Sequence, residues 1–320
     1  MKMLVTGGLG FIGSNFIRYI LSRYPECALV NLDLMTYAGN PANLKDIEDD
    51  PRYSFVRGDI CDRECVTDVL ERHQVDTIIH FAAESHVDRS ISDASVFVRT
   101  NVLGTHVLLE AAWIQGIRRF IHVSTDEVYG SIPVGSFTES DGLNPSSPYS
   151  ASKAGSDLLA RSYYLTYGLP VIITRCTNNF GPYQYPEKLI PLFVTNLFEG
   201  RTVPVYGTGR NVREWIYVID HCRAIDCILT RGKPGEIYNI GSGNELTNLE
   251  ITHRLLELTG RDTSQITFVQ DRPGHDWRYS LDASKLRSMG WTPEYDFEAG
   301  LRETVAWYRE NGWWWKPLLP

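Results

Sequence analysis

The sequence lacks the excess of positive charge that is typical of proteins that bind nucleic acids or acidic membranes. Its 31 lysines and arginines face 39 aspartates and glutamates, which gives a net charge of −8. A general affinity for polyanions needs clustered cations, so we expect no nucleic-acid partner. No apolar run approaches membrane-spanning length, and the first residues lead directly into a strand pattern, which leaves no room for a signal or transit peptide. We therefore expect a cytoplasmic protein with no membrane partner.

The chain also has few cysteines, and they are scattered. Its six cysteines show neither paired C-x-x-C spacing nor the histidine partners of a zinc site. We therefore expect reduced thiols and no metal at Cys27, Cys61, Cys65, Cys176, Cys222 and Cys227. No repeat or low-complexity segment interrupts the 320 residues, which suffice for one elaborated domain or two closely joined domains.

What the sequence does contain, at its start, is a strand pattern, a glycine-rich turn and a helical pattern in that order. Lys2 to Thr6 is predicted as a short apolar strand, and Gly7 to Gly13 has the form G-x-x-G-x-x-G before a helix from Ser14 to about Tyr24. Such glycines let the backbone approach a pyrophosphate, whose charge then meets the helix N-terminus. A glycine triplet alone is a weak signal, because glycine-rich turns are common.

A carboxylate follows at the position that a dinucleotide requires. The second predicted strand, Ala28 to Leu32, ends at Asp33, twenty residues after Gly13. A carboxylate there accepts hydrogen bonds from an adenosine ribose and repels a 2′-phosphate. The sequence therefore predicts NAD rather than NADP.

Two further strand ends carry candidate residues. Asp59 follows a third predicted strand and is placed to meet the adenine edge, although a plain turn explains it equally well. A fourth strand, Thr77 to Phe81, leads into Ala82-Ala83-Glu84-Ser85-His86, whose small residues let a cofactor lie close to the backbone. Glu84, Ser85 and His86 either line the cleft or face away from it. His80 lies inside the apolar run and is expected to be a core histidine with satisfied hydrogen bonds.

The predicted strand Phe120 to Val123 ends in Ser124-Thr125-Asp126-Glu127. Adjacent carboxylates at the tip of a buried strand are unusual, and both can face one cleft because the turn breaks the alternation of side chains. Two carboxyl groups there suggest an acid and a base. An arbitrary Asp-Glu pair is more often a helix cap or solvent-exposed. The apolar strand, the opening glycines and a downstream Tyr-x-x-x-Lys pair favour the catalytic interpretation.

That downstream pair is Tyr149 and Lys153, which lie four residues apart on one face of a helix predicted from Tyr149 to Tyr167. A free phenol has a pKa of about 10, so a tyrosine base that works near neutrality needs its pKa lowered by roughly three units, about 4 kcal/mol. We expect Lys153 and a bound nicotinamide ring to supply the necessary positive charge.

The second half of the chain predicts the end of a main sheet and a separate lobe. The predicted elements are a strand at Pro170 to Arg175, strands at Val212 to His221 and Glu236 to Gly243 that return to the main sheet, and helices at Asn248 to Thr259 and Phe297 to Glu310. The fold class is therefore α/β, a doubly wound parallel Rossmann sheet with a smaller C-terminal substrate-binding lobe. We expect an NAD-binding domain of residues 1–175 with returning segments at about 212–243, and a substrate domain of residues 176–211 and 244–320.

Two predicted helices, Asn101 to Gln115 and Tyr149 to Tyr167, are amphipathic. They either face the core alone or also bury a face against a partner subunit, and the sequence does not separate these possibilities. The run Trp313-Trp314-Trp315 is expected to be a docked C-terminal anchor rather than a carbohydrate platform.

Several segments together resemble a known family over nearly the whole chain. They are Gly7 to Gly13, Ala82 to Ser90, Ser124 to Gly130, Ser147 to Lys153, Asn178-Asn179, Pro186 to Pro191 and Asp271 to Asp276. With them the chain resembles the extended short-chain dehydrogenases/reductases and, within these, the dTDP-glucose 4,6-dehydratases. The related 4-epimerases share the glycines and the Tyr-x-x-x-Lys pair but lack the Asp-Glu pair.

The resemblance implies a homodimeric, NAD-dependent lyase of deoxysugar and rhamnose biosynthesis that converts dTDP-glucose to dTDP-4-keto-6-deoxyglucose and water. Tyr149 would remove the proton of the sugar 4-hydroxyl while hydride passes from C4 to NAD, and Thr125 would hydrogen-bond the same oxygen. Glu127 would take the C5 proton and Asp126 would protonate the departing 6-hydroxyl. Hydride would then return to C6, so the cofactor should stay bound.

The resemblance also implies which residues form the site. The catalytic residues would be Thr125, Asp126, Glu127, Tyr149 and Lys153. The cofactor-binding residues would be Gly7, Gly10, Phe11, Ile12, Gly13, Asp33, Thr36, Asp59, Ile60, Ala82, Ala83, Ser85, Thr100, Tyr149 and Lys153. The substrate-binding residues would be Ser85, His86, Thr125, Asn178, Lys188, Leu189, Pro204, Tyr206, Arg213, Asn248, Arg272 and His275.

Other interpretations stay open at this point. Arg213 can neutralise a diphosphate with its planar fork, or it can form a surface ion pair with Glu214. The chemistry of a UDP-sugar 4-epimerase or a C4 oxidase would need no acid-base pair. A regulatory or structural dimer without turnover is a third possibility, against which the intact reactive residues argue.

Overall fold

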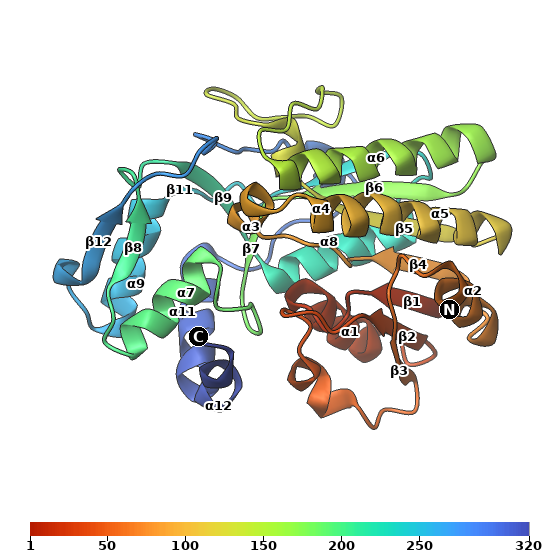
Figure 1. The fold of residues 1–320 in the computed structure, drawn as a ribbon, viewed down its shortest axis with the longest axis horizontal. Helices are drawn as coiled ribbons and strands as arrows, with labels where there is room; N and C mark the ends of the chain where they lie inside the picture. Colours follow the sequence, from red (N-terminus) through yellow and green to blue (C-terminus); the bar gives the residue numbers. More distant parts are fainter. Residues whose placement is uncertain (320) are drawn as a thin grey trace.

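The computed structural model of the chain describes residues 1–319 and has two adjoining parts, with the main sheet on the right of Figure 1 and a smaller lobe on the left. Within these residues the main sheet has seven strands, and every neighbouring pair is parallel. In spatial order they are β10 (Ile237–Ile240), β6 (Val171–Cys176), β5 (Arg119–Thr125), β4 (Thr77–His80), β1 (Lys2–Thr6), β2 (Ala28–Asp33) and β3 (Tyr53–Arg57). The strand order reverses between β1 and β4, and ligands of such sheets bind at this point.

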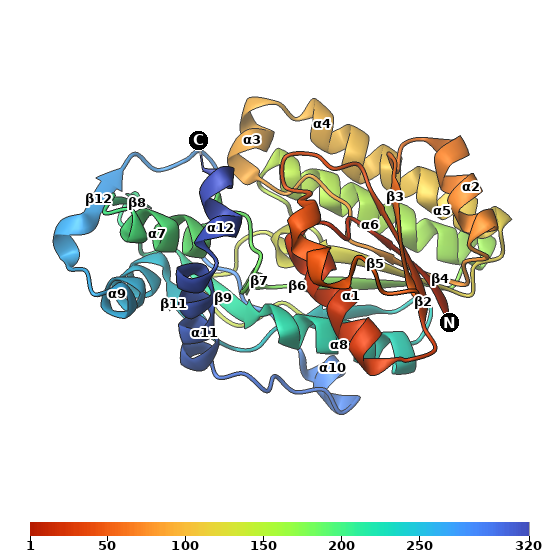
Figure 2. The ribbon, with the colours of Figure 1, turned by 90° about the horizontal axis from the view of Figure 1, so that it is seen from below.

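Helices cover both faces of the main sheet, because alternate residues of each strand point to opposite sides. In β1, Met3 and Val5 belong to an apolar cluster with α1 and α8, whereas Leu4 belongs to a second cluster with α2, α5 and α6. Figure 2 shows these two helical layers on either side of the sheet. The helices are α1 (Phe11–Arg23), α8 (Val218–Arg231), α2 (Arg63–Arg72), α5 (Thr105–Ile114) and α6 (Pro148–Tyr167). The predicted doubly wound Rossmann sheet is confirmed.

The smaller lobe has its own core and two small sheets. Its strands are β7 (Asn178–Phe180), β9 (Val212–Tyr217) and β11 (Glu245–Thr247) in one sheet, and β8 (Val203–Tyr206) and β12 (Ile266–Val269) in the other. Its helices are α7 (Leu189–Phe198), α9 (Asn248–Thr259), α11 (Phe297–Glu310) and α12 (Gly312–Trp315). A third apolar cluster joins them. Trp314 and Trp315 are buried in it, while Trp313 is exposed, so two of the three tryptophans anchor the C-terminal segment.

One predicted strand is wrong. Val212 to His221 was expected to return to the main sheet, but β9 ends at Tyr217 and pairs with β7 and β11 in the lobe. The chain then enters α8 at Val218, and it is this helix and β10 that return to the main sheet. The error arose because Trp215, Ile216, Tyr217 and Val218 are all buried, so the apolar run continues across the strand-to-helix junction.

Shorter elements complete the chain. They are η1 (Pro41–Ile47), α3 (Val87–Ser92), α4 (Ser95–Phe97), η2 (Val98–Gly104), η3 (Asp126–Tyr129), η4 (Thr263–Gln265), α10 (Ser284–Ser288) and η5 (Lys316–Leu318). The helix predicted from Asn101 begins as the π-helical turn η2 and becomes α-helical only at Thr105. No helix among residues 1–319 has the length and apolar character to cross a membrane.

His80 is a core histidine, as predicted. It is 1% exposed, and its two ring nitrogens lie 2.7 Å from Thr6 Oγ1 and 3.0 Å from Thr105 Oγ1. The six cysteines are free thiols, and each is buried or half-buried.

Candidate active site

The carboxyl ends of the central strands and the facing surface of the lobe enclose one cavity of about 490 Å³. Every residue predicted above as catalytic, cofactor-binding or substrate-binding lines this cavity. The residues come from segments as far apart in the chain as Gly7 and His275, which shows how the topology gathers them.

The glycine turn between β1 and α1 forms the floor of the cavity at the point where the strand order reverses. Gly7 has a φ of +70°, and a Cβ there would lie 2.6 Å from the backbone nitrogen of Ala82. A Cβ on Gly13 would lie 2.4 Å from the carbonyl oxygen of Gly7. Within the described chain no side chain caps the N-terminus of α1, and its first turn has no acidic residue. Its free N–H groups therefore suit the pyrophosphate of a dinucleotide.

Asp33 is buried at the end of β2, beside the glycine turn. One carboxylate oxygen accepts a hydrogen bond from the Leu9 backbone at 3.0 Å, and the other accepts one from the Met35 backbone at 2.8 Å. Burial raises the pKa of Asp33, while these two hydrogen bonds oppose the shift. A carboxylate fixed between the glycine turn and the next loop fits the ribose of NAD, and together with the open helix N-terminus it makes the cavity suitable for this cofactor.

Asp59 lies farther along the same strand edge, after β3. Its carboxylate accepts the Cys61 backbone N–H at 2.8 Å and pairs with Arg99 at 2.9 Å. Asp59 therefore closes a turn and also lines the cavity, so its role in the turn does not exclude contact with the adenine.

Tyr149 is the second residue of α6. A capping box of Ser147 and Ser150 fixes the start of this helix, and the Tyr149 backbone N–H donates to the buried Ser90 hydroxyl at 3.1 Å. Lys153 lies one turn later and donates from Nζ to the Val123 carbonyl at 2.8 Å. Burial lowers the pKa of Lys153 to about 8.

In the protein alone, the pKa of Tyr149 is not lowered. Burial, followed by the Glu127 carboxylate, raises the pKa of Tyr149 well above its ordinary value, and Thr125 opposes the shift by a hydrogen bond. In the protein alone desolvation dominates, and the expectation that Lys153 together with a bound nicotinamide ring lowers the pKa of Tyr149 stays a prediction.

Thr125 and Asp126 lie where β5 turns into η3. The Thr125 hydroxyl accepts the Glu127 backbone N–H and lies 3.2 Å from Asp126 Oδ1. Asp126 is 3% exposed, and its Oδ2 has no hydrogen-bond partner among residues 1–319. Burial, joined by the Glu127 carboxylate, raises the pKa of Asp126 well above its ordinary value. Burial therefore favours the neutral form of Asp126, which has an oxygen available to a ligand.

Glu127 has a different electrostatic environment. Burial raises its pKa as well, but Lys188, Arg272 and Arg213 all act in the opposite direction. These cations favour the anionic form of Glu127, whereas Asp126 faces mainly other carboxylates. Burial raises the pKa of both carboxyl groups, but more cations oppose the shift at Glu127, and two carboxyl groups in unlike surroundings suit an acid and a base.

The lobe contributes cations to the cavity. Arg213 is buried, donates to the carbonyl oxygens of Val212 and Asp276, and stacks 4.3 Å from the ring centroid of Tyr279. It does not pair with Glu214, whose carboxylate accepts the backbone N–H groups of Gly243 and Leu281 on the other side of β9. The alternative of a surface ion pair is therefore wrong.

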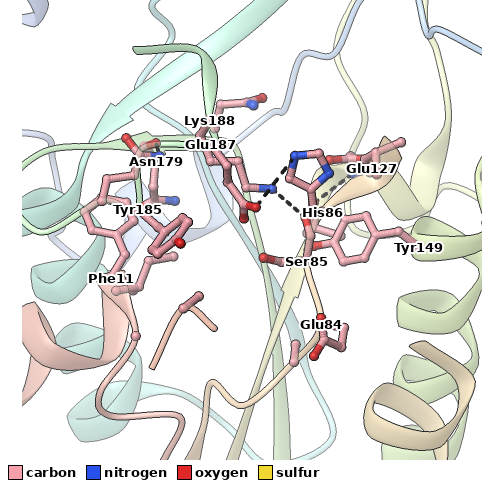
Figure 3. A pocket seen from close by; sticks show the side chains of 18 of the residues that line it. Phe11, Glu84, Ser85, His86, Glu127, Tyr149, Asn179, Tyr185, Glu187 and Lys188 are labelled. Carbon is pink, nitrogen blue, oxygen red and sulfur yellow. Dashed lines mark hydrogen bonds and ion pairs between the residues drawn. The ribbon is translucent and has the colours of Figure 1, made fainter. Parts of the chain in front are cut away.

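Lys188 and His86 face each other near the centre of the cavity (Figure 3). Lys188 Nζ donates to the Ser85 carbonyl at 2.6 Å, and burial lowers its pKa. His86 Nε2 lies 3.8 Å from a carboxylate oxygen of Glu187, and burial lowers the pKa of this histidine too. Figure 3 places Glu127 and Tyr149 on one side of these residues and Phe11, Asn179 and Tyr185 on the other.

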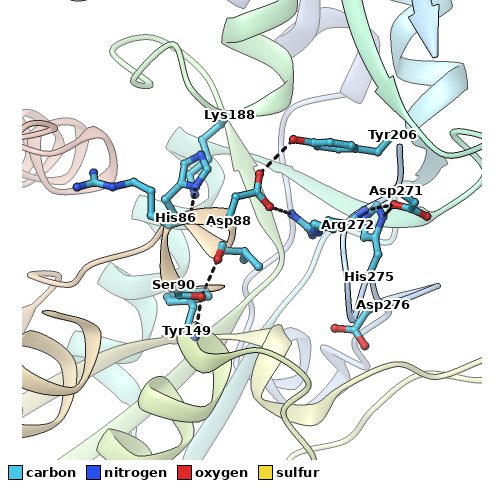
Figure 4. Close-up of polar contacts among 12 residues, drawn as sticks. His86, Asp88, Ser90, Tyr149, Lys188, Tyr206, Asp271, Arg272, His275 and Asp276 are labelled. Carbon is cyan, nitrogen blue, oxygen red and sulfur yellow. Dashed lines mark hydrogen bonds and ion pairs between the residues drawn. The ribbon is translucent and has the colours of Figure 1, made fainter. Parts of the chain in front are cut away.

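A polar bridge connects α3 to the lobe (Figure 4). The Asp88 carboxylate accepts the Tyr206 hydroxyl at 3.3 Å and pairs with Arg272 at 3.4 Å. His275 forms an ion-pair contact with Asp271 at 2.6 Å, so both predicted basic residues of this loop have acidic neighbours.

Sequence reasoning missed several residues that line the cavity. They include Asp88, Cys176, Gln184, Tyr185, Glu187 and Tyr279. Glu187 had a signal, because it precedes Lys188 in a segment that was singled out. Tyr279 had none, since its place under Arg213 depends on the isolated bridge between Val212 and Arg278.

Comparison with known proteins supports an assignment of the whole chain. Residues 4–304 match the family described as GDP-mannose 4,6 dehydratase. The chain is 55% identical to a dTDP-glucose 4,6-dehydratase of Streptomyces niveus, over 99% of this chain and 96% of that protein. The crystal structure of DesIV, a dTDP-glucose 4,6-dehydratase of Streptomyces venezuelae with NAD and a second small molecule bound, superposes with a TM-score of 0.98 at 59% identity over 100% of both chains. A UDP-glucose 4-epimerase of Thermus thermophilus with NAD shares the fold, with a TM-score of 0.91 at 31% identity over 97% of this chain and 100% of that one.

Proposed function

The chain belongs to the dTDP-glucose 4,6-dehydratases, and we propose that the residues of its candidate active-site cavity divide the removal of water among a tyrosine base, a glutamate base and an aspartic acid. The protein is an NAD-dependent lyase that converts dTDP-glucose to dTDP-4-keto-6-deoxyglucose and water. The observation that carries the division of roles is the pair Asp126 and Glu127, which lines the same cavity as Tyr149, with Lys188, Arg272 and Arg213 acting on Glu127.

NAD, when bound, accepts a hydride from C4 of the sugar and returns it to C6. Tyr149 takes the proton of the 4-hydroxyl, and Thr125 hydrogen-bonds to the same oxygen. Lys153 holds a positive charge at the next turn of α6, anchored to the Val123 carbonyl at 2.8 Å. The glycine turn and Asp33 hold the dinucleotide at the other end of the cavity.

The carboxyl pair acts once C4 has become a ketone, because a ketone acidifies the neighbouring C5–H bond. Glu127, whose anionic form is favoured by Lys188, Arg272 and Arg213 against the effect of burial, removes the C5 proton and later returns a proton to C5. Asp126, whose neutral form is favoured by burial, donates its proton to the 6-hydroxyl, which leaves as water.

The roles also imply a proton transfer between turnovers. Each reaction leaves Tyr149 with the proton of the 4-hydroxyl and leaves Asp126 without its own, so one proton has to pass from the tyrosine to the aspartate. The Thr125 hydroxyl lies 3.2 Å from Asp126 Oδ1 and is proposed above to contact the 4-oxygen of the sugar together with Tyr149. We therefore assign it to the path between the two groups.

The nucleotide and diphosphate of the substrate bind under the lobe. Arg213 and Lys188 neutralise the diphosphate, with Arg272 and His275 at its side. The remaining contacts come from residues that line the same wall of the cavity, namely Ser85, His86, Asn178, Leu189, Pro204, Tyr206 and Asn248. We assign residues 176–211 and 244–320, with β9, to the nucleotide-sugar-binding domain and the remainder to the NAD-binding domain.

The proposed function is tested by incubating the purified protein, without added NAD, with dTDP-glucose in heavy water. We expect a product that is lighter by one water and carries one deuterium at C5, read by mass and by the alkaline absorbance of the 4-keto sugar. This result requires elimination, solvent exchange and retained cofactor together. A sugar isomer of unchanged mass would instead indicate an epimerase. If no product forms, adding NAD and then replacing the substrate by UDP-glucose separates cofactor loss from a different substrate.

We further propose a homodimer formed by α5 and α6. These neighbouring helices expose large apolar side chains, and the tilted rings of Trp113 and Tyr167 connect them with centroids 4.7 Å apart. The exposed residues are Leu103 before α5, Trp113, Ile114, Leu158, Leu165 and Tyr167. An apolar face of this kind on a surface is typical of a subunit interface.

We also propose a cytoplasmic location, which the free cysteines support.

Replacing Leu165 by aspartate should therefore shift the protein from dimer to monomer. Leu165 is 68% exposed, so a charge there leaves the monomer fold intact but would be desolvated in the interface. Sedimentation velocity measures the change. Phe268→Asp, at an exposed position of β12 in the lobe, is the matched control and should stay dimeric. An unchanged sedimentation coefficient for L165D would exclude this face as the interface.

A further inference from the structure

Two segments from different parts of the fold meet beside the cavity. Residues 34–40 follow β2 of the main sheet, and residues 185–188 precede α7 of the lobe. Thr36, Ala38 and Gly39 of the first segment line the cavity, as do Glu187 and Lys188 of the second. The first segment belongs to the cofactor side and the second to the nucleotide-sugar side.

Tyr37 joins the two segments. Its hydroxyl donates a hydrogen bond to Glu187 Oε1 at 2.8 Å. The guanidinium carbon of Arg89 lies 3.8 Å from the centroid of the Tyr37 ring, and the Tyr185 ring meets it edge-on at 5.4 Å. The other carboxylate oxygen of Glu187 lies 3.8 Å from His86 Nε2. Figure 3 labels both residues. Tyr37 is thus held by a hydrogen bond to Glu187, by the Arg89 guanidinium on the face of its ring and by ring contact with Tyr185.

The segment that carries Tyr37 is also fixed to Asp33. Met35 has a left-handed backbone with a φ of 59°, which is uncommon for a residue with a side chain, and its N–H donates to Asp33 Oδ1 at 2.8 Å. A Cβ on Gly39 would lie 2.8 Å from the same oxygen, so the segment folds tightly over the carboxylate. Movement of residues 34–40 would therefore disturb the group that binds the ribose.

We propose that Tyr37 and Glu187 form a clasp that retains NAD and makes its release sensitive to the nucleotide on the other side of the cavity. The inference rests on the use of NAD in the proposed function. A dinucleotide held by Asp33, Thr36 and the glycine turn lies under a segment whose far side is tied to Glu187. The hydrogen bond has to break before this segment can swing away. Lys188, next to Glu187, binds the substrate diphosphate, so a bound nucleotide also fixes the clasp.

Replacing Tyr37 by phenylalanine removes the hydrogen bond and keeps the ring under Arg89. We expect NAD to leave this variant about tenfold to a hundredfold faster, as suits the loss of one hydrogen bond to a carboxylate. The measurement mixes the purified holoenzyme with excess isotope-labelled NAD and follows the label in the protein-bound cofactor by mass spectrometry. In wild-type protein added dTDP should slow the exchange, and in Y37F it should have little effect.

Two comparisons separate a clasp from a general loss of stability. Tyr217→Phe removes a similar hydrogen bond, from Tyr217 to Glu303 at 3.1 Å in the lobe, and should exchange NAD at the wild-type rate. Glu187→Gln tests the other partner should Y37F fail to fold. The double variant should release NAD no faster than the faster single variant, because both changes act on one interaction. Wild-type exchange in Y37F, or additive effects in the double variant, would overturn the proposal.

NAD exchange is measured without turnover, so its outcome does not depend on the sugar chemistry. A protein that fails to dehydrate dTDP-glucose yet shows the Y37F effect would contradict the proposed function and support the clasp. If the protein dehydrates dTDP-glucose and NAD exchanges equally fast in the wild type and in Y37F, the proposed function is supported and the clasp is contradicted.

Discussion

Replacing Tyr149 by phenylalanine should lower the rate of product formation by about two to four orders of magnitude, the usual contribution of a general base. The phenol is the group that takes the proton of the 4-hydroxyl, and a benzene ring has no atom that can do so. The change should leave the local structure in place, because the ring keeps its edge contact with Phe97 and the backbone N–H keeps the Ser90 hydroxyl. The measurement is the initial rate of 4-keto sugar formation with added NAD.

Tyr238→Phe is the matched control for this prediction. Tyr238 is buried in β10, and its hydroxyl accepts a hydrogen bond from the Lys233 backbone, outside the residues that line the cavity. This variant should form product at close to the wild-type rate. If Y149F also stays within tenfold of the wild type, another group is the base.

Replacing Glu127 by glutamine should stop the reaction after oxidation at C4. The amide has nearly the size of the carboxylate but cannot accept the C5 proton, so reduced cofactor should accumulate when substrate is added and no 4-keto-6-deoxy sugar should appear. Exchange of the C5 hydrogen with solvent deuterium should fall by about two to four orders of magnitude. Absorbance of the reduced cofactor and mass analysis of the recovered sugar measure the two effects separately.

Glu84→Gln makes the same change in the same cavity and is the control for Glu127. Glu84 is buried at the end of β4, and burial raises its pKa, but the proposed reaction gives it no part in proton transfer at C5. Exchange at C5 should persist in this variant. C5 exchange at the wild-type rate in E127Q would show that a different residue is the base.

The sequence predicts those parts of the molecule in which a local pattern has one structural outcome. A glycine turn between a strand and a helix, with Asp33 twenty residues later, is typical of a strand end of a Rossmann sheet. Tyr149 and Lys153 share a helix face because of their spacing alone. These patterns were enough to place the cofactor and the carboxyl pair at one cavity. They could not show where β9 ends, because Tyr217 and Val218 are both buried and the apolar run continues across the junction.

Features that depend on burial or on distant pairs are beyond such patterns. The sequence places Lys153 beside Tyr149, but it cannot show that burial raises the pKa of Tyr149 in the protein alone, because the depth of burial is known only from the fold. Tyr37 and Glu187 are separated by 150 residues and lie in irregular segments without periodicity. Nothing local relates one to the other, so the clasp is visible only in three dimensions.

Strand β9 has one more consequence for how this site can change. Arg213 and Glu214 are neighbours in the chain, yet the first faces the cavity and the second fixes the backbone of Gly243 and Leu281 behind it. Successive side chains of the strand thus point to opposite sides, one toward the cavity and the next away from it. The alignment of the strand therefore decides whether a positive or a negative side chain faces the substrate. Deleting Val212 would move Glu214 into the position of Arg213 and so present a carboxylate to a diphosphate. Point substitutions can tune this wall of the cavity, whereas the shortest insertion or deletion would reverse its polarity.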